Sequence, residues 1–324
     1  MPIFAGGRVG GAADNAVAVH RSFPPNHAPA GDLVIGVVDT GFPEGDPHPW
    51  FGNHIEGSDK AVEPLPADPR SMLRLDDGHG TFVTGRILLE APAATVRMAR
   101  PTSWHDGEVS AAIGAVSGCG LINLSFLGDG LEQEPPAGIA AALADLPPET
   151  VVVIAAGNDR GSKVVYPAGI DLPETRARII TVGAVDQTRI TQFGAPPPVA
   201  DFSNFGSWVD CYAEGVQVLG PHVWYDEVAD PDGASAAQTF RGWAVWSGTS
   251  FAAATVTGRI ARVAMDLGTT PKEAATLVLE RAPKIPVPNE NPLYEPDWRP
   301  FVRGVTSTWG EIMVPTVPAG APSS

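Results

Sequence analysis

Short apolar runs alternate with helix-like segments through the middle of this chain, and this alternation constrains the fold more than any other feature. The clearest run is Val-Val-Val-Ile-Ala-Ala at residues 151–156, and residues 33–38 and 121–126 are similar. A strand that is apolar on both faces must be covered on both sides, which is typical of parallel sheets. Strands that alternate with helices therefore predict an α/β fold, with a largely parallel central sheet between helix layers.

Composition divides the chain into three parts. Residues 1–30 are rich in Gly, Ala and Pro and are predicted to form an extended N-terminal arm. Residues 31–282 carry the alternating strands and helices and are predicted to be the folded domain. Residues 283–324 are rich in Pro, and we expect a C-terminal tail without a core of its own.

The charge balance excludes one class of partner. The chain has 37 Asp and Glu against 21 Lys and Arg, a net charge of −16. Nucleic-acid binding needs clustered cations, so no nucleic-acid partner is predicted.

The two cysteines, Cys119 and Cys211, have no zinc-like spacing, so we predict no metal site and no cofactor. Two buried unpaired thiols are favoured, and one disulfide is the alternative.

No stretch of 18 apolar residues and no apolar segment behind a basic start is found, so neither a membrane span nor a signal peptide is expected. The expected location is cytoplasmic, and a shortened form of a secreted protein is the alternative. The oligomeric state is left open.

Polar residues stand at the ends of several apolar runs. Asp39 follows the run at 33–38, and Asn158 follows the run at 151–156. His79 lies between two glycines, and Ser250 opens a predicted helix. A serine hydroxyl becomes a good nucleophile when a base takes its proton and a third group orients that base. An imidazole held by a carboxylate fills both roles, so these residues predict nucleophilic catalysis.

The four segments together resemble the subtilisin-like serine proteases, the subtilase family. The matching motifs are VVDTG around Asp39, GHGT around His79, AAGN ending at Asn158 and SGTS ending at Ser250. Their order is that of subtilisin, whereas α/β-hydrolases place the histidine after the serine, and all seven histidines here precede Ser250. The resemblance covers about residues 32–282 and implies a three-layer αβα fold and peptide-bond hydrolysis.

Roles carried over from the family make Ser250 the nucleophile, His79 the general base and Asp39 its orienting partner. Asn158 would donate to the oxyanion, beside the N–H of Ser250. A peptide or protein substrate would bind as an added strand. The substrate-binding residues would be Leu124, Ser125, Phe126 and Leu127 on one side and Ala155, Ala156 and Gly157 on the other.

Several positions depart from the family pattern. Leu127 stands where relatives have a glycine at the mouth of the pocket for the P1 side chain, the residue before the cleaved bond. Residues 88–92 lead directly out of the predicted helix after His79, where secreted relatives carry an inserted calcium-binding loop. Residues 221–243 look longer than the corresponding connection in the family. Together with the expected lack of a signal peptide, the missing calcium loop favours an intracellular processing protease.

Two other readings follow from the same residues. Asp-Thr-Gly also occurs in aspartic proteases, but those need two aspartates sharing a proton, and no second Asp-Thr-Gly or Asp-Ser-Gly exists here. The alternative that stays open is a catalytically silent peptide-binding module with the same fold, because the segment around Leu127 is altered.

Overall fold

The structure is a computed structural model. It describes residues 16–19, 28–29, 31–44, 48–57, 61–66, 73–74, 76–126, 134–171, 175–189, 196–226, 238–288 and 296–304.

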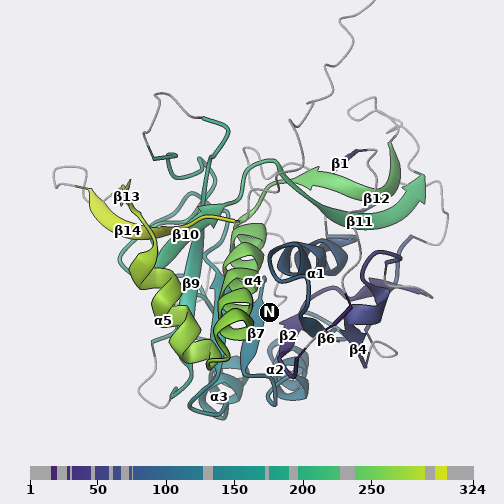
Figure 1. Cartoon of the computed structure of the whole chain (residues 1–324), viewed down its shortest axis with the longest axis horizontal. Helices are drawn as coiled ribbons and strands as arrows, with labels where there is room; N and C mark the ends of the chain where they lie inside the picture. Colours follow the sequence, from purple (N-terminus) through teal and green to yellow (C-terminus); the bar gives the residue numbers. More distant parts are fainter. Residues whose placement is uncertain are drawn as a thin grey trace, which may run out of the picture.

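A nine-stranded sheet forms the centre of the protein (Figure 1). Every neighbouring pair is parallel except the pair at one edge, β13 and β14. In spatial order the strands are β13 (Lys284–Val287), β14 (Asp297–Val302), β10 (Cys211–Glu214), β9 (Arg178–Val185), β8 (Val151–Ala155), β7 (Leu121–Leu124), β2 (Val34–Val38), β6 (Thr95–Ala99) and β4 (Ile55–Glu56).

Both faces of this sheet are buried. Along β8, Val151 and Val153 belong to one apolar cluster, whereas Val152 and Ile154 belong to another on the opposite face. The first cluster includes side chains from α1 and α4, and the second includes side chains from α2 and α3. The bounds of the helices are α1 (His79–Glu90), α2 (Asp106–Ala115), α3 (Ala137–Ala144), α4 (Thr249–Leu267) and α5 (Pro271–Arg281). The three-layer α/β fold predicted from the apolar runs is confirmed.

A smaller antiparallel sheet lies over α1 (Figure 1). It consists of β1 (Val17–Ala18), β12 (Thr239–Trp246) and β11 (Val218–Asp226). Pro221 and Gly242 interrupt the apolar pattern of its two long strands. The structure accommodates Pro221 at a register shift between β11 and β12, a place where proline is tolerated. Residues 227–237 of this connection lie outside the described residues.

Part of the predicted C-terminal tail belongs to the central sheet. β14 pairs in parallel with β10, and β13 forms the edge of the sheet. The prolines of this segment weaken the strand pattern in the sequence, with Pro286 in β13 and Pro300 in β14, although an edge strand such as β13 tolerates proline. The sheet therefore continues beyond residue 282. At the other end of the chain, part of the predicted arm forms β1.

The remaining short elements are η1 (Gly52–His54) and a two-stranded sheet of β3 (Phe42–Pro43) and β5 (Val62–Glu63). Cys119 and Cys211 are both buried and unpaired. No helix in the described part of the chain is long and apolar enough to span a membrane.

Candidate active site

Three neighbouring strands end at the same edge of the central sheet. Asp39 follows β2, Ser125 follows β7, and Ala156 follows β8. In open α/β sheets, the carboxyl ends of the strands are where ligands bind. Residues far apart in the sequence are thus brought to one place by the order of the strands.

Asp39 and His79 are in direct contact at this edge. The Oδ1 atom of Asp39 lies 2.7 Å from Nδ1 of His79, and both side chains are buried. The same oxygen accepts the backbone N–H of Thr40 at 2.7 Å. Because a carboxylate can only accept, Nδ1 carries the proton and Nε2 of His79 is left as the basic nitrogen.

Aromatic side chains fix the plane of the His79 ring. Its centroid lies 5.6 Å from Trp246, with the rings nearly perpendicular, and 5.5 Å from Phe251. Phe82 packs against both of these neighbours. Phe82 is therefore part of the aromatic wall behind the His79 ring.

The turn before α1 requires a glycine at position 78. Gly78 has φ of +80°, in the left-handed region. A β-carbon there would lie 2.8 Å from Nε2 of the buried His222. Burial lowers the pKa of His222 to about 3, and the neighbouring His48 and His79 add to this shift. His222 is therefore a neutral packing residue, and it places no second positive charge beside the base.

Ser250 lies in the first turn of α4 and is 4% exposed. Its hydroxyl donates to the carbonyl oxygen of Ser125 at 3.2 Å. The next residue, Phe251, packs on the ring of His79, which brings the first turn of α4 close to that ring. Catalytic hydrogen bonds are often long or misaligned before substrate binds, and this arrangement is compatible with a hydroxyl that turns toward His79.

Asn158 is oriented by Thr249, the residue before Ser250. Its Oδ1 accepts both the backbone N–H and the hydroxyl of Thr249, each at 2.9 Å. Those two donors fix which end of the amide is oxygen, so Nδ2 points away from Thr249. In the first turn of a helix the N–H groups have no intrahelical acceptor, which leaves the N–H of Ser250 available beside this amide. Two donors suited to an oxyanion thus lie close together.

Thr249, inside the SGTS motif, and Asn204 hold this arrangement together, although neither was assigned a chemical role from the sequence. The hydroxyl of Thr249 accepts the N–H of Gly157 at 3.0 Å, which joins the end of β8 to α4. Asn204 donates to the carbonyl of Ala156 and accepts the N–H groups of Asp159 and Gly161. Asn204 lies in the segment FSNFG at residues 202–206, whose residue types do not by themselves indicate a chemical role.

The predicted substrate-binding residues lie at the ends of β7 and β8. Leu124 and Phe126 point into the apolar cluster beneath the sheet, whereas the hydroxyl of Ser125 donates to the side chain of Asn123 at 2.8 Å and lies 3.3 Å from the carbonyl of Ser250. Ala155, Ala156 and Gly157 are buried at the end of β8. Backbone groups, not these apolar side chains, are therefore what the site offers to a substrate. Leu127 lies outside the described residues.

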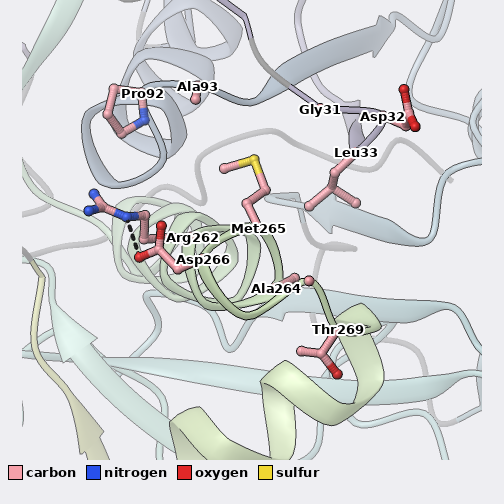
Figure 2. A pocket seen from close by; sticks show the side chains of 11 residues that line it. Gly31, Asp32, Leu33, Pro92, Ala93, Arg262, Ala264, Met265, Asp266 and Thr269 are labelled. Atoms are coloured by element: carbon pink, nitrogen blue, oxygen red, sulfur yellow. Dashed lines mark hydrogen bonds and ion pairs between the residues drawn. The ribbon is translucent and has the colours of Figure 1, made fainter.

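A cavity of about 660 Å³ lies elsewhere, at the opposite ends of the same elements (Figure 2). Its lining includes Leu33 before β2, Pro92 after α1 and Met265 in the last turns of α4. Ser250 occupies the first turn of α4, whose 19 residues span about 28 Å. This cavity is therefore separate from the candidate active site.

Within the described ranges, no group of three or more His, Cys, Asp or Glu side chains is arranged to hold a metal ion.

Comparisons with known proteins identify the family of the chain. The model of the subtilase family, peptidase family S8, matches residues 31–294. The chain is 32% identical over 182 residues to subtilisin-like protease 2 of Pseudogymnoascus destructans, covering 52% of this chain and 38% of that protein. It is 31% identical over 201 residues to a thermophilic serine proteinase of Bacillus sp. (strain AK1), covering 57% and 44%. The matched part thus spans less than half the length of either curated relative.

Among solved structures, a protease from Pseudoalteromonas arctica PAMC 21717 has a TM-score of 0.58 and 21% identity, over 78% of this chain and 83% of that one. At this identity the likeness shows the fold alone. The family model covers most of the chain, including all four motifs. The chain therefore belongs to the subtilase family.

Proposed function

We propose that this protein is a serine endopeptidase that hydrolyses peptide bonds through an acyl-enzyme on Ser250. The observation that carries the proposal is the 2.7 Å contact between Asp39 and His79, with Ser250 next to an aromatic neighbour of that ring. A buried carboxylate that orients an imidazole beside a helix-borne serine is the arrangement that acyl transfer needs.

In the acylation step, Nε2 of His79 takes the hydroxyl proton of Ser250 while Oγ bonds to the carbonyl carbon of the substrate. His79 then gives this proton to the leaving amine as the C–N bond breaks. In the deacylation step, a water molecule attacks the acyl carbon while Nε2 of His79 takes its proton. His79 then returns this proton to Oγ of Ser250 as the ester bond breaks and the acid is released. Asp39 holds the ring and stabilises its charged form without taking the proton itself.

The negative charge on the tetrahedral oxygen is matched by two donors, Nδ2 of Asn158 and the N–H of Ser250. Both are buried and held by the Thr249 contacts, so little reorganisation is needed when charge develops. The ends of β7 and β8 offer backbone groups along which a peptide or protein substrate would add as a strand.

A catalytically silent peptide-binding module is the second candidate. The observation in its favour is that the Ser250 hydroxyl donates to the Ser125 carbonyl instead of to His79. A module that binds peptides without cleaving them would keep this arrangement when substrate is present.

Labelling with a fluorophosphonate separates the two functions, because this probe bonds covalently only to an activated serine. We expect labelling at Ser250, located by peptide mass spectrometry, together with hydrolysis of labelled casein. Ser250→Ala should lose both, and Ser117→Ala, at the far end of α2, should lose neither. A wild-type chain that is folded but unlabelled would establish the binding module instead.

A further inference from the structure

Glu63 is a buried carboxyl group that the hydrolytic steps do not use. It ends β5, which pairs with β3 just after the triad aspartate. Its residue is 3% exposed, although it lies between two segments rich in Pro and Asp. A buried glutamate without a lysine or arginine bonded to it is costly unless its oxygens are hydrogen-bonded.

The partners of Glu63 lie on both sides of the catalytic dyad. Its two carboxyl oxygens lie 3.0 and 3.1 Å from the backbone nitrogen of Gly78, the residue before His79. Its carboxyl also hydrogen-bonds to the side chain of Thr40, the residue after Asp39. The hydroxyl oxygen of Thr40 in turn accepts the N–H of Gly80 at 2.9 Å. Glu63 therefore contacts Gly78 before His79 and Thr40 after Asp39, and Thr40 in turn holds Gly80 on the other flank of His79.

Side chains from outside the helix cap the amino terminus of α1, Thr40 at Gly80 and Glu63 at Gly78. Gly78 occupies the N-cap position and offers no side chain, so the free N–H groups of this turn must find acceptors elsewhere. Glu63 supplies one of them from a different strand. The position of His79 relative to Asp39 thus depends on a contact from outside both motifs.

The carboxyl group of Glu63 is neutral at pH 7. Burial is the main reason that its pKa is raised to about 8; repulsion from Asp77 and Asp39 adds to this shift, while hydrogen bonds to Thr40 and Gly78 oppose it. Arg74 also faces Glu63, but its guanidinium is paired with Asp77 at 2.7 and 2.9 Å. His222, packed against Gly78, is neutral as well. In its neutral form, Glu63 adds no negative charge of its own beside Asp39 and His79.

We propose that Glu63 is a positioning residue of the hydrolytic site, joining Thr40 beside Asp39 to the amino-terminal turn of α1 that carries His79. The inference rests on the proposed function of the Asp39, His79 and Ser250 residues. The carboxyl group of Glu63 can accept the N–H of Gly78 and hydrogen-bond to the hydroxyl of Thr40 at once. A glutamine of the same shape can also hydrogen-bond to both, whereas a leucine of similar volume can hydrogen-bond to neither.

The test measures the rate at which a rhodamine fluorophosphonate inactivates the purified full chain at pH 7, resolved into the maximal rate kinact and the half-saturating concentration KI. For Glu63→Leu we expect kinact to fall by about 10- to 100-fold with little change in KI, because the base is displaced while the probe still binds. Glu63→Gln should recover most of this loss. Glu56→Gln, which removes a carboxylate from β4 away from the site, serves as the control for charge and should match wild type.

A second measurement reports on the dyad directly. The Nδ1 proton of His79, held against Asp39, gives a low-field proton resonance, which we expect to move or broaden in Glu63→Leu and to return in Glu63→Gln. If Glu63→Leu does not fold, Thr40→Val breaks the other end of the bridge and should lower kinact in the same way.

Wild-type kinact in a folded Glu63→Leu or Thr40→Val chain would overturn the proposal, as would a folded Glu63→Gln chain that labels as slowly as the leucine variant. Ser250→Ala separates this failure from that of the proposed function. If Ser250→Ala still reacts with the probe, the hydrolytic assignment itself is wrong. If it does not, unchanged labelling of Glu63→Leu removes only the role of Glu63.

Discussion

The Nδ1 atom of His79 lies 2.7 Å from Oδ1 of Asp39, although 40 residues of chain separate them. The contact forms because Asp39 directly follows β2 and His79 begins α1. The hydroxyl of Thr40 accepts the N–H of Gly80 and so holds the first turn of α1 against the end of that strand. The contact sets the tautomer of the imidazole and leaves Nε2 free to act as a base.

Asp39→Asn tests that relationship. An asparagine would keep the shape of the side chain, but its NH₂ group can favour the wrong tautomer of His79, so kcat should fall by about 10⁴-fold. The measurement is steady-state hydrolysis of a peptide substrate, with the melting temperature as a check on the fold. Asp32→Asn, at the other end of β2, is the control and should be normal. A folded Asp39→Asn chain with wild-type kcat would show that Asp39 does not orient the base.

Asn158→Ala removes a proposed oxyanion donor, and we expect kcat to fall by about 10²–10³-fold with little change in KM. It also leaves the N–H of Thr249 without its acceptor, so the free energy of unfolding should fall by about 1–3 kcal/mol. Asn158→Asp keeps the acceptor but not the donor. It should regain stability in urea denaturation without regaining kcat. A change confined to KM in either variant would mean that Asn158 contacts the bound substrate and not the transition state.

The sequence predicts that Leu127 influences which P1 residues the protein prefers. If its side chain enters the P1 pocket, large aromatic P1 residues should be disfavoured relative to small ones, since each misplaced methylene is worth about 1–3 kcal/mol of discrimination. Leu127→Gly should then widen P1 tolerance in a peptide-library profile, with fluorophosphonate labelling unchanged. An unchanged profile combined with a loss of about 2–5 kcal/mol of stability would identify Leu127 as a core residue instead.

Glu63 should make stability depend on pH. Its pKa is raised from 4.5 to about 8 by folding, so between these values the folded chain holds a proton that the unfolded chain releases. This contribution is complete below about pH 4.5 and is lost as pH rises toward 8, with a slope of up to about 1.4 kcal/mol per pH unit. Glu63→Gln cannot titrate, so its urea midpoint should rise relative to wild type between pH 5 and 8. Parallel midpoints for the two chains across this range would show that Glu63 does not carry the proton.

Local patterns were enough to predict much of the fold. The run at 151–156 appears as β8, with alternate side chains in the two apolar clusters. Pro271 suits a first helical turn, and α5 begins there, with a capping box between Thr270 and Glu273. Strand periodicity and helix caps depend only on residues a few positions apart, so they can be recognised in the sequence alone.

The small sheet and the strands of the tail were missed for the opposite reason. Proline and glycine in β11, β12 and β13 obscure the period of a strand, and whether such a segment pairs depends on an edge supplied by distant residues. The pairing of β14 with β10 joins positions about 90 residues apart, and no local pattern records it.

By itself the sequence determined the motifs around Asp39, His79, Asn158 and Ser250. The order of its apolar runs also determined the parallel sheet, at whose edge these residues lie. Only the tertiary structure decided which polar groups support them. Thr249 holds Asn158, and Glu63 holds the turn before His79. In sequence Glu63 is indistinguishable from a surface residue, since most glutamates are exposed, and the SGTS motif does not show what Thr249 binds. Its partners, its burial and the pKa that follows from them are set by strands that the chain brings beside it only when it folds.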